Sequence, residues 1–117
     1  MARYGEDAGE AMDLLSTLRL ADDANRRTAT LAYGRQRLVE IALALATRPR
    51  ILLLDEPAAG IPAAESGEVF GAIASLPPSV SVLFIEHDMG LVFRFAERIT
   101  VLAGGRIIAE GDAETIR

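Results

Sequence analysis

Two short apolar runs, each closed by acidic residues, constrain the fold of this chain most. Residues 51–54 (Ile-Leu-Leu-Leu) lead into Asp55-Glu56-Pro57, and residues 80–85 lead into Glu86-His87-Asp88. Apolarity that is continuous rather than alternating predicts strands buried on both faces, as in a parallel sheet. The prolines that flank the first run favour a strand over a segment of buried helix.

Helical patterns precede and separate these two runs, and this order predicts an α/β fold with a parallel sheet. We expect helices over residues 7–20, 34–47, 63–76 and 89–97. Asp7 and Glu10 would form a capping box at the start of the first helix. The expected buried positions of the first two helices are Ala8, Met12, Leu15 and Leu18, and then Leu38, Ile41, Ala42 and Leu45.

The later helices and the end of the chain carry further local signals. On the helix over 63–76 we expect Glu65, Ser66 and Glu68 to face solvent. Gly104-Gly105 predicts a hairpin that joins strands at 99–103 and 106–110. Asp112 can cap a final helical turn.

Composition narrows the possible chemistry. The 117 residues contain no Cys, one His and 12 basic residues against 17 acidic ones, which gives a net charge of −5. This balance argues against a nucleic-acid binder and offers no basic patch for anionic lipid. Every basic residue is Arg, so the 117 residues contain no lysine that could bind a phosphate in a P-loop. No disulfide, thiolate metal site or multi-histidine cluster is possible among them.

Targeting signals are not expected. The longest apolar runs, 41–46 and 51–54, are far shorter than the roughly 20 residues that span a bilayer. Met1–Tyr4 leads into an acidic stretch and not into the apolar core of a signal peptide. A cytoplasmic location is therefore the default expectation.

The acidic ends of the two strands are the first candidate site. In open α/β sheets, ligands bind outside the carboxyl ends of the strands, and these ends converge if the two strands are neighbours. Asp55 suits a magnesium ion held through water beside a phosphate, Glu56 could polarise an attacking water, and His87 could hydrogen-bond a terminal phosphate. The alternative is that the strands end in polar residues simply because they reach solvent.

The second candidate site is a helix start. The segment Leu31-Ala32-Tyr33-Gly34-Arg35 places a small residue and a glycine where backbone amides and the helix dipole favour an anion. The alternative is an ordinary helix entry that contains a glycine.

Taken together, these segments resemble the carboxyl-terminal half of an ABC-type ATPase. Leu31, Ala32, Tyr33, Gly34 and Arg35 stand where the family has its Leu-Ser-Gly-Gly-Gln signature. Residues 51–56 resemble a Walker B strand with the catalytic glutamate, residues 57–62 take the D-loop position, and His87 takes that of the switch histidine. The likeness extends from about Glu6 to Arg117.

Several short sequence segments are similar to segments in the ATP-binding subunits of branched-chain amino-acid importers. They are Tyr33 within the signature, Glu40-Ile41-Ala42, Asp55-Glu56-Pro57-Ala58-Ala59-Gly60, Ile85-Glu86-His87-Asp88-Met89 and residues 99–106. The resemblance implies a partial P-loop NTPase core with a terminal β-hairpin, preceded by the last part of the helical subdomain. Residues 1–47 would be the remnant of that subdomain with the signature helix, and residues 48–117 the second half of the core.

The resemblance also implies cofactors, partners and roles. ATP and Mg²⁺ would be the cofactors of the intact parent, with Asp55 on the metal through water, Glu56 and His87 catalytic, and residues 31–35, Ala59 and Gly60 near nucleotide. Partners would be membrane-spanning permease subunits and a second ATPase subunit, with the assembly peripheral to the inner face of the cell membrane. We expect no nucleic-acid partner.

The chain departs from the family pattern in four ways. Ala32 replaces the serine whose hydroxyl contacts the terminal phosphate, and Arg35 replaces glutamine, although its charge could attract that phosphate. Pro62 stands where Asp or Asn is common. The base-stacking aromatic, the Walker A loop and the glutamine loop have no counterpart here.

The missing Walker A strand has a structural consequence. In the family this strand lies between the histidine-bearing strand and the strand at 99–103, so we expect a gap with exposed apolar strand edges. Self-association through these edges is therefore predicted, and the chain alone is not expected to hydrolyse ATP. The alternatives are a non-catalytic folding or association module, a split enzyme completed by another polypeptide, and a chromosome-maintenance ATPase, whose coiled coils leave no trace here.

Overall fold

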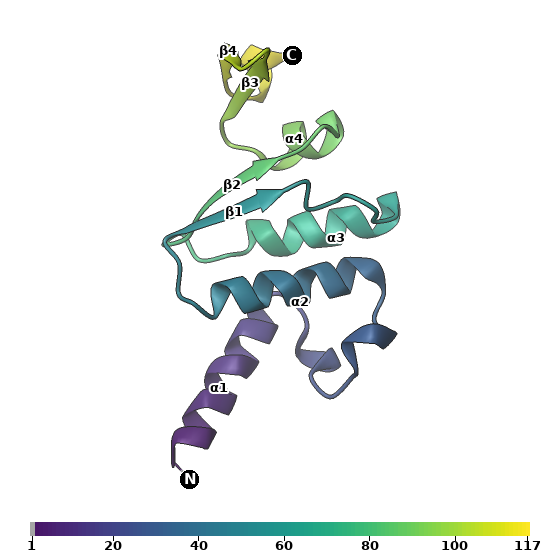
Figure 1. Cartoon of the computed structure of the whole chain (residues 1–117), viewed down its shortest axis with the longest axis vertical. Helices are drawn as coiled ribbons and strands as arrows, with labels where there is room; N and C mark the ends of the chain where they lie inside the picture. Colours follow the sequence, from purple (N-terminus) through teal and green to yellow (C-terminus); the bar gives the residue numbers. More distant parts are fainter. Residues whose placement is uncertain (1) are drawn as a thin grey trace. The chain divides into compact units, whose positions relative to one another are not determined.

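A computed structural model describes the backbone of residues 2–117 and the side chains from residue 5 onward (Figure 1). The expectation about a signal peptide concerns Met1–Tyr4, of which Met1 and the side chains of residues 2–4 lie outside the described part. The chain forms two compact units, of which the first ends at Ile85 and the second covers Glu86–Arg117. No helix in the described residues has the length and apolarity needed to cross a membrane.

The first unit contains three helices and a parallel pair of strands. The helices are α1 (Ala2–Thr17), α2 (Tyr33–Leu45) and α3 (Ala63–Ala74), with short 3₁₀ turns at Ala21–Asp23 and Thr28–Thr30. The strands β1 (Ile51–Asp55) and β2 (Ser81–Ile85) pair in parallel. Ile51 lies opposite Ser81, and Asp55 lies opposite Ile85. The fold class read from the sequence is therefore confirmed.

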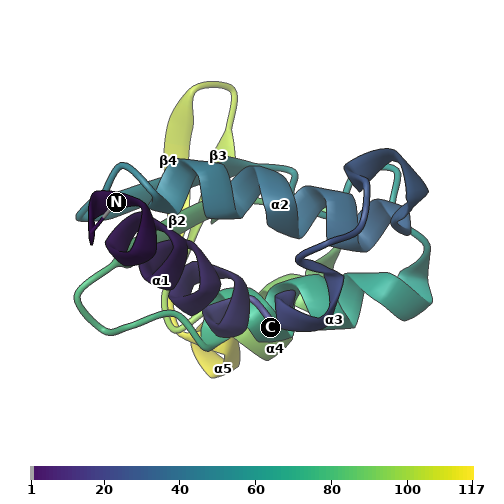
Figure 2. The ribbon, with the colours of Figure 1, turned by 90° about the horizontal axis from the view of Figure 1, so that it is seen from below.

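One hydrophobic cluster holds this unit together. Helices α2 and α3 lie side by side on one side of the strand pair (Figure 1, Figure 2). Leu52 of β1 points into the same cluster, and the rings of Phe70 and Phe84 meet edge to face across α3 and β2. All four buried positions predicted for α2 are confirmed, and the cluster includes Leu18, Leu20, Leu38, Ile41, Ala42, Leu45, Leu52, Val69, Ala72 and Ile73.

The prediction that both strands are buried on both faces is wrong for the described residues. Leu53 is 69% exposed and Leu83 is 61% exposed, whereas Leu52 is 4% exposed. Ile51 and Ile85 are exposed as well. Burial alternates along both strands because α2 and α3 cover only one side of the sheet, and nothing in the first unit covers the other.

The start of the first helix also differs from the prediction. Helix α1 already includes Ala2, so Asp7 and Glu10 lie inside it and form no capping box. Ala8 and Met12 are exposed, Leu15 is half-buried, and Leu18 is buried just beyond the helix end. The apolar positions toward the C-terminal end of α1 reach the cluster, and the earlier ones do not.

The second unit consists of α4 (Met89–Phe95), the antiparallel pair β3 (Ile99–Ala103) and β4 (Arg106–Gly111), and α5 (Ala113–Ile116). Gly104 and Gly105 have φ angles of +56° and +76°, which the tight hairpin requires and glycine tolerates. Asp112 caps α5 by accepting a hydrogen bond from the Thr115 amide at 2.8 Å. The hairpin and the cap are both confirmed.

Candidate functional site

The first candidate site is the carboxyl end of β1. Asp55 is the last residue of the strand and is exposed, and half-buried Glu56 follows it. Glu56 has a φ of +45°, in the left-handed region that non-glycine residues seldom adopt. Its N–H still donates to the Ile85 carbonyl at 2.8 Å, so Glu56 stays tied to the end of β2 while the chain turns away from the sheet. A strained non-glycine residue at a strand end is a frequent mark of a functional position.

The loop after Glu56 is held from two directions. The Ala59 N–H donates to the Glu56 carbonyl at 2.9 Å, and Gly60 follows with a φ of +74°. From α2, the Arg37 side chain donates to the Ala59 carbonyl at 3.4 Å. Both Ala59 and Gly60 are exposed. The loop at residues 57–62 is therefore anchored to the helix that follows the second candidate site.

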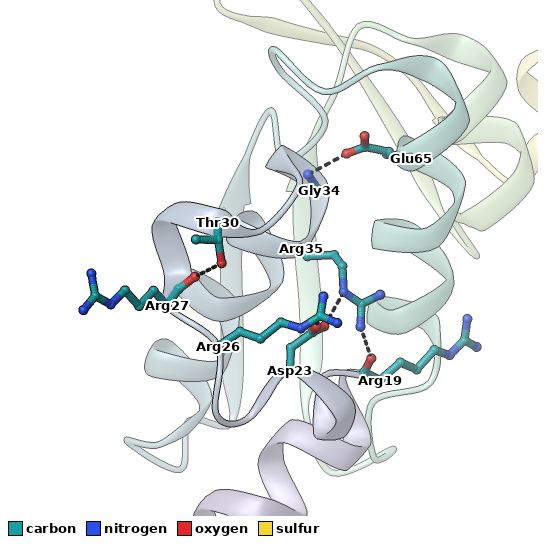
Figure 3. A network of polar contacts seen from close by, with 8 residues as sticks. All are labelled: Arg19, Asp23, Arg26, Arg27, Thr30, Gly34, Arg35 and Glu65. Carbon is teal, nitrogen blue, oxygen red and sulfur yellow. Dashed lines mark hydrogen bonds and ion pairs between the residues drawn. The ribbon is translucent and has the colours of Figure 1, made fainter.

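The second candidate site is the start of α2. Ala32 occupies the N-cap position and offers no side-chain acceptor, and the first turn of the helix has no acidic residue. A carboxylate from α3 provides the missing acceptor, since the Gly34 N–H donates to Oε2 of Glu65 at 2.9 Å (Figure 3). The helices are in close contact here, because a Cβ on Gly34 would lie 3.2 Å from the Glu65 Cβ and 3.4 Å from Cγ2 of Val69. Only glycine fits this crossing without displacing α3.

The rest of the signature segment is pinned to its surroundings. Leu31 is buried, while Ala32 and Tyr33 are exposed, Tyr33 at 68%. The Gln36 side chain donates to the Leu31 carbonyl at 2.9 Å. This contact spans the turn that leads into α2 and fixes its shape.

The Arg35 guanidinium is already bound by groups of the chain itself. Its Nε donates to Asp23 at 2.5 Å, and its Nη2 donates to the Arg19 carbonyl at 2.7 Å (Figure 3). The Asp23 side chain is only 8% exposed and also pairs with Arg26 at 3.4 Å. Arg35 therefore fastens the first turn of α2 to the preceding loop.

The second unit carries the remaining predicted residues. His87 is exposed and Glu86 is half-buried. Asp88 is the N-cap of α4, and its side chain accepts from the Leu91 N–H at 3.2 Å. Asp88 thus has a structural role in starting that helix. The convergence of the two acidic strand ends on one crevice stays a prediction, although the strands that carry them are parallel neighbours.

The described side chains fit a magnesium site with few protein ligands. No three His, Asp or Glu side chains among them gather closely enough to form a metal cage. Mg²⁺ commonly takes one or two carboxylates and completes its octahedral shell with waters and phosphate oxygens. The exposed Asp55 carboxylate at a strand end satisfies that requirement.

Sequence reasoning missed Glu65 as a site residue. It placed Glu65 and Ser66 on a solvent-facing surface, but Glu65 is half-buried against Gly34 and Ser66 is 7% exposed. The Ser66 hydroxyl donates to the Pro62 carbonyl at 3.3 Å. Glu68 is exposed, as predicted. A glycine in the first turn of an uncapped helix was the available signal, because such a turn needs an acceptor from elsewhere.

Comparison with known proteins is consistent with this arrangement. The ABC transporter family matches residues 3–59. The chain is 48% identical to a high-affinity branched-chain amino acid transport ATP-binding protein, BraF of Pseudomonas aeruginosa, over 88% of this chain and 41% of that protein. It is 44% identical to LivG of Escherichia coli, which has the same description, over 92% of this chain and 45% of that protein.

A solved structure extends the likeness to the fold. The ADP conformation of MJ1267, an ATP-binding cassette of an ABC transporter, matches with a TM-score of 0.85 and 33% identity, over 95% of this chain and 44% of that one. The chain spans less than half the length of the curated relatives it matches.

In sequence and in fold, the chain is therefore similar to the ATP-binding proteins of ABC transporters. More narrowly, the likeness to the carboxyl-terminal half of the branched-chain amino-acid type is confirmed.

Proposed function

We propose that these residues supply the signature, Walker B and switch-histidine part of an ATPase that drives an importer. One observation carries the proposal: Asp55 and Glu56 close a strand at the edge where a parallel neighbour also ends, in a chain 44–48% identical to ATP-binding proteins. Polar residues at such an edge are the usual ligand-binding groups of an α/β sheet.

Asp55 and Glu56 divide the chemistry between them. Asp55, exposed at the strand end, would hold Mg²⁺ through water. When bound, Mg²⁺ neutralises charge on the phosphate oxygens. The Glu56 carboxylate would orient a water molecule toward the terminal phosphate and accept its proton, while the water oxygen bonds to phosphorus, the bond to the bridging oxygen breaks and ADP leaves. The hydrogen bond from the Glu56 N–H to the Ile85 carbonyl and the left-handed backbone of Glu56 fix where that carboxylate starts.

The other predicted residues contact the nucleotide or its terminal phosphate. His87 senses the terminal phosphate, and Ala59 with Gly60 lies near nucleotide on the anchored loop. Leu31, Ala32, Tyr33, Gly34 and Arg35 face the nucleotide of a second ATPase subunit. Because Ala32 carries no hydroxyl and Arg35 is bound to Asp23, the backbone amides provide most of this contact.

The names of the relatives support the proposed solute, and the resemblance to ABC-type ATPases supports the proposed partners. BraF and LivG are described as high-affinity branched-chain amino acid transport proteins, so branched-chain amino acids are the proposed cargo. Permease subunits in the membrane and a second ATPase subunit are the proposed partners, at the inner face of the cell membrane. The domain division at residues 47 and 48 belongs to the same proposal.

Nucleotide affinity must come from residues outside these 117. They contain no lysine and no phosphate-binding glycine loop, and in ATPases of this class such a loop provides most of the grip on the phosphates. The 117 residues alone are therefore proposed to bind ATP weakly and not to hydrolyse it. A polypeptide that carries the Walker A part would restore activity.

The alternative function, an association module, is favoured by the open face of the strand pair. Leu53, Leu83, Ile51 and Ile85 are each at least 60% exposed in the first unit, and contiguous apolar surface of this kind commonly marks an interface. Self-association through this face and the adjoining strand edges would bury it. Size-exclusion chromatography at micromolar concentration should show oligomers, and a strictly monomeric profile would contradict this.

Reconstitution tests the main proposal. The chain is co-expressed with the amino-terminal part of the Pseudomonas relative that it does not match, and ATP hydrolysis is measured with and without Mg²⁺. We expect magnesium-dependent activity that Glu56→Gln lowers by about 100-fold or more. Glu97→Gln, an exposed carboxylate of the second unit, is the matched control and should leave the rate unchanged. A folded complex with no activity would refute the main proposal, and a Glu56→Gln complex as active as wild type would refute the assignment of Glu56.

A further inference from the structure

A cavity lies in the first unit at the edge of the strand pair opposite Asp55. Because β1 and β2 are parallel, the segments that lead into them, residues 48–50 and 76–80, meet at the amino-terminal edge of the sheet (Figure 1). Together with the last turn of α1 and the end of α2, they line a cavity of about 340 Å³. This volume is at the lower end of the range of small-molecule sites, so a small ligand fits.

The buried part of the cavity lining is apolar and belongs to the core. Leu45 is 7% exposed and is a member of the hydrophobic cluster, and Leu14, Leu76 and Val80 pack against that cluster. These side chains are therefore held in place before any ligand arrives, and a preformed surface needs little ordering on binding. The part of a ligand that lies on this surface must be apolar.

Two arginines line the same cavity, and they differ in their partners. Nη2 of Arg48 donates to Oε1 of Glu10 at 2.7 Å, and both side chains of this ion pair are exposed. Arg50 has no carboxylate partner within the described part of the chain. Among the lining residues and their ion-pair partners, one positive charge therefore remains uncompensated.

The turn that carries these arginines is fixed in an uncommon backbone conformation. Arg48 has a φ of +54°, in the left-handed region that residues other than glycine seldom adopt. Its N–H donates to the Leu45 carbonyl at 2.9 Å, and the Arg50 carbonyl accepts from the Ser81 N–H at 2.8 Å. Such strain persists only where the surrounding structure imposes it, and it is common beside ligand sites. The turn thus holds two guanidinium groups next to an apolar surface.

This combination selects one class of ligand. A carboxylate can accept two parallel hydrogen bonds from a guanidinium, and an aliphatic chain covers the apolar lining. Inorganic phosphate has the charge without the chain, and an aliphatic alcohol has the chain without the charge. A zwitterionic amino acid adds an ammonium group, which the two arginines repel.

We propose that this cavity binds small aliphatic carboxylates, with Arg50 on the carboxylate and Leu14, Leu45 and Leu76 against the chain. The cavity shares no residue with the strand ends and the signature segment, so the inference does not depend on the proposed ATPase function. A bound carboxylate would join α1 to the turn before β1 and would stabilise the folded first unit by mass action.

The test is an NMR titration of the 117-residue chain with hexanoate at neutral pH, followed in ¹H–¹⁵N spectra. We expect saturable shifts of the amides of Thr17, Ser79 and Val80, which line the cavity. Arg50→Gln should raise the dissociation constant about tenfold, because a hydrogen bond between two charged groups is lost.

Three further compounds test the selection of the ligand class. Hexan-1-ol keeps the chain without the charge, so it should bind the wild-type chain about tenfold more weakly than hexanoate. Leucine and inorganic phosphate should cause no saturable shift of the same amides.

Three further variants test the charge at the cavity. Glu10→Gln frees Arg48 from its partner and should lower the dissociation constant for hexanoate about threefold, a change that damage to the fold cannot produce. Glu68→Gln and Arg27→Gln change the charge at exposed positions that do not line the cavity, and both should bind hexanoate as the wild type does.

The contrary results are equally distinct. Hexanoate without a saturable effect on the three amides would overturn the site. Equal affinities of the wild type and Arg50→Gln, or of hexanoate and hexan-1-ol, would overturn recognition of the carboxylate by Arg50. Leucine that binds as tightly as hexanoate would refute the argument from the charge of the two arginines.

Discussion

The substitution Gly34→Ala tests the packing at the crossing of α2 and α3. The new Cβ would lie 3.0 Å from Oε2 of Glu65, 3.2 Å from its Cβ and 3.4 Å from Cγ2 of Val69. Two of these atoms are fixed to α3, and Val69 is fully buried. The helix can yield only by shifting the core cluster, and overpacking of this kind costs about 1–3 kcal/mol.

The higher helix propensity of alanine opposes this cost. Alanine is favoured over glycine in a helix interior by about 0.8–1.0 kcal/mol, and Gly34 has no positive φ that alanine would strain. Because Gly34 is only the second residue of α2, little of that gain is realised there. We therefore expect the free energy of unfolding to fall by about 1–2 kcal/mol.

Gly71→Ala is the matched control and should change stability in the opposite direction. Gly71 lies inside α3, and its new Cβ would approach only the flexible end of Arg19, at 3.3 Å from Nη1. The higher helix propensity of alanine is then hardly offset by steric strain, so we expect the free energy of unfolding to rise by about 0.5–1 kcal/mol. Urea unfolding followed by circular dichroism measures both variants. A Gly34→Ala chain as stable as wild type would refute the close-packing argument.

Two further predictions concern the exposed face and the last helix. Leu52→Ala should lower the free energy of unfolding, measured by urea melts, by about 2–5 kcal/mol. Leu53 lies on the same strand but is 69% exposed, so Leu53→Ala should change this free energy by less than about 1 kcal/mol. Equal effects of the two substitutions would contradict the one-sided burial of β1. The hydrogen bond from the Thr115 N–H lowers the pKa of Asp112 below its usual 3.8. The contribution of the Asp112 cap to stability should therefore be complete above the pKa that Asp112 has in the unfolded chain. It should be lost as the pH falls through the lower pKa of the folded chain. The Thr115 amide shift should titrate below pH 3.8 and lose that titration in Asp112→Asn; a midpoint at or above this value would count against the cap.

Local patterns predicted most elements of this fold. The apolar stripe of α2, both parallel strands, the glycine hairpin and the Asp112 cap depend on residues close in sequence, and these predictions are confirmed. The start of α1 was predicted wrongly, because a capping box is a weak signal that the helical residues before it override.

The site was only partly predictable, for a physical reason. Motif order identified Leu31–Arg35 and Asp55-Glu56 as candidates. The acceptor for the Gly34 amide, however, comes from Glu65, 31 residues later. Such a contact depends on how two helices cross, which periodicity within one helix does not reveal. The partner of Arg35 was missed likewise, since Asp23 lies in the irregular turns before α2.

The apolar runs of β1 and β2 were misread for a related reason. Continuous apolarity predicts cover on both faces, yet the first unit covers one. The relatives are more than twice the matched length, and continuous apolarity is typical of strands in parallel sheets that are covered on both faces.

Calorimetric titration with magnesium ATP tests the central claim most directly. The account predicts no detectable binding by the folded 117-residue chain, and stoichiometric binding once the amino-terminal part of a relative is bound to it. Stoichiometric binding by the chain alone, abolished by Asp55→Ala, would contradict it, because the strand ends would then hold nucleotide without a phosphate-binding loop.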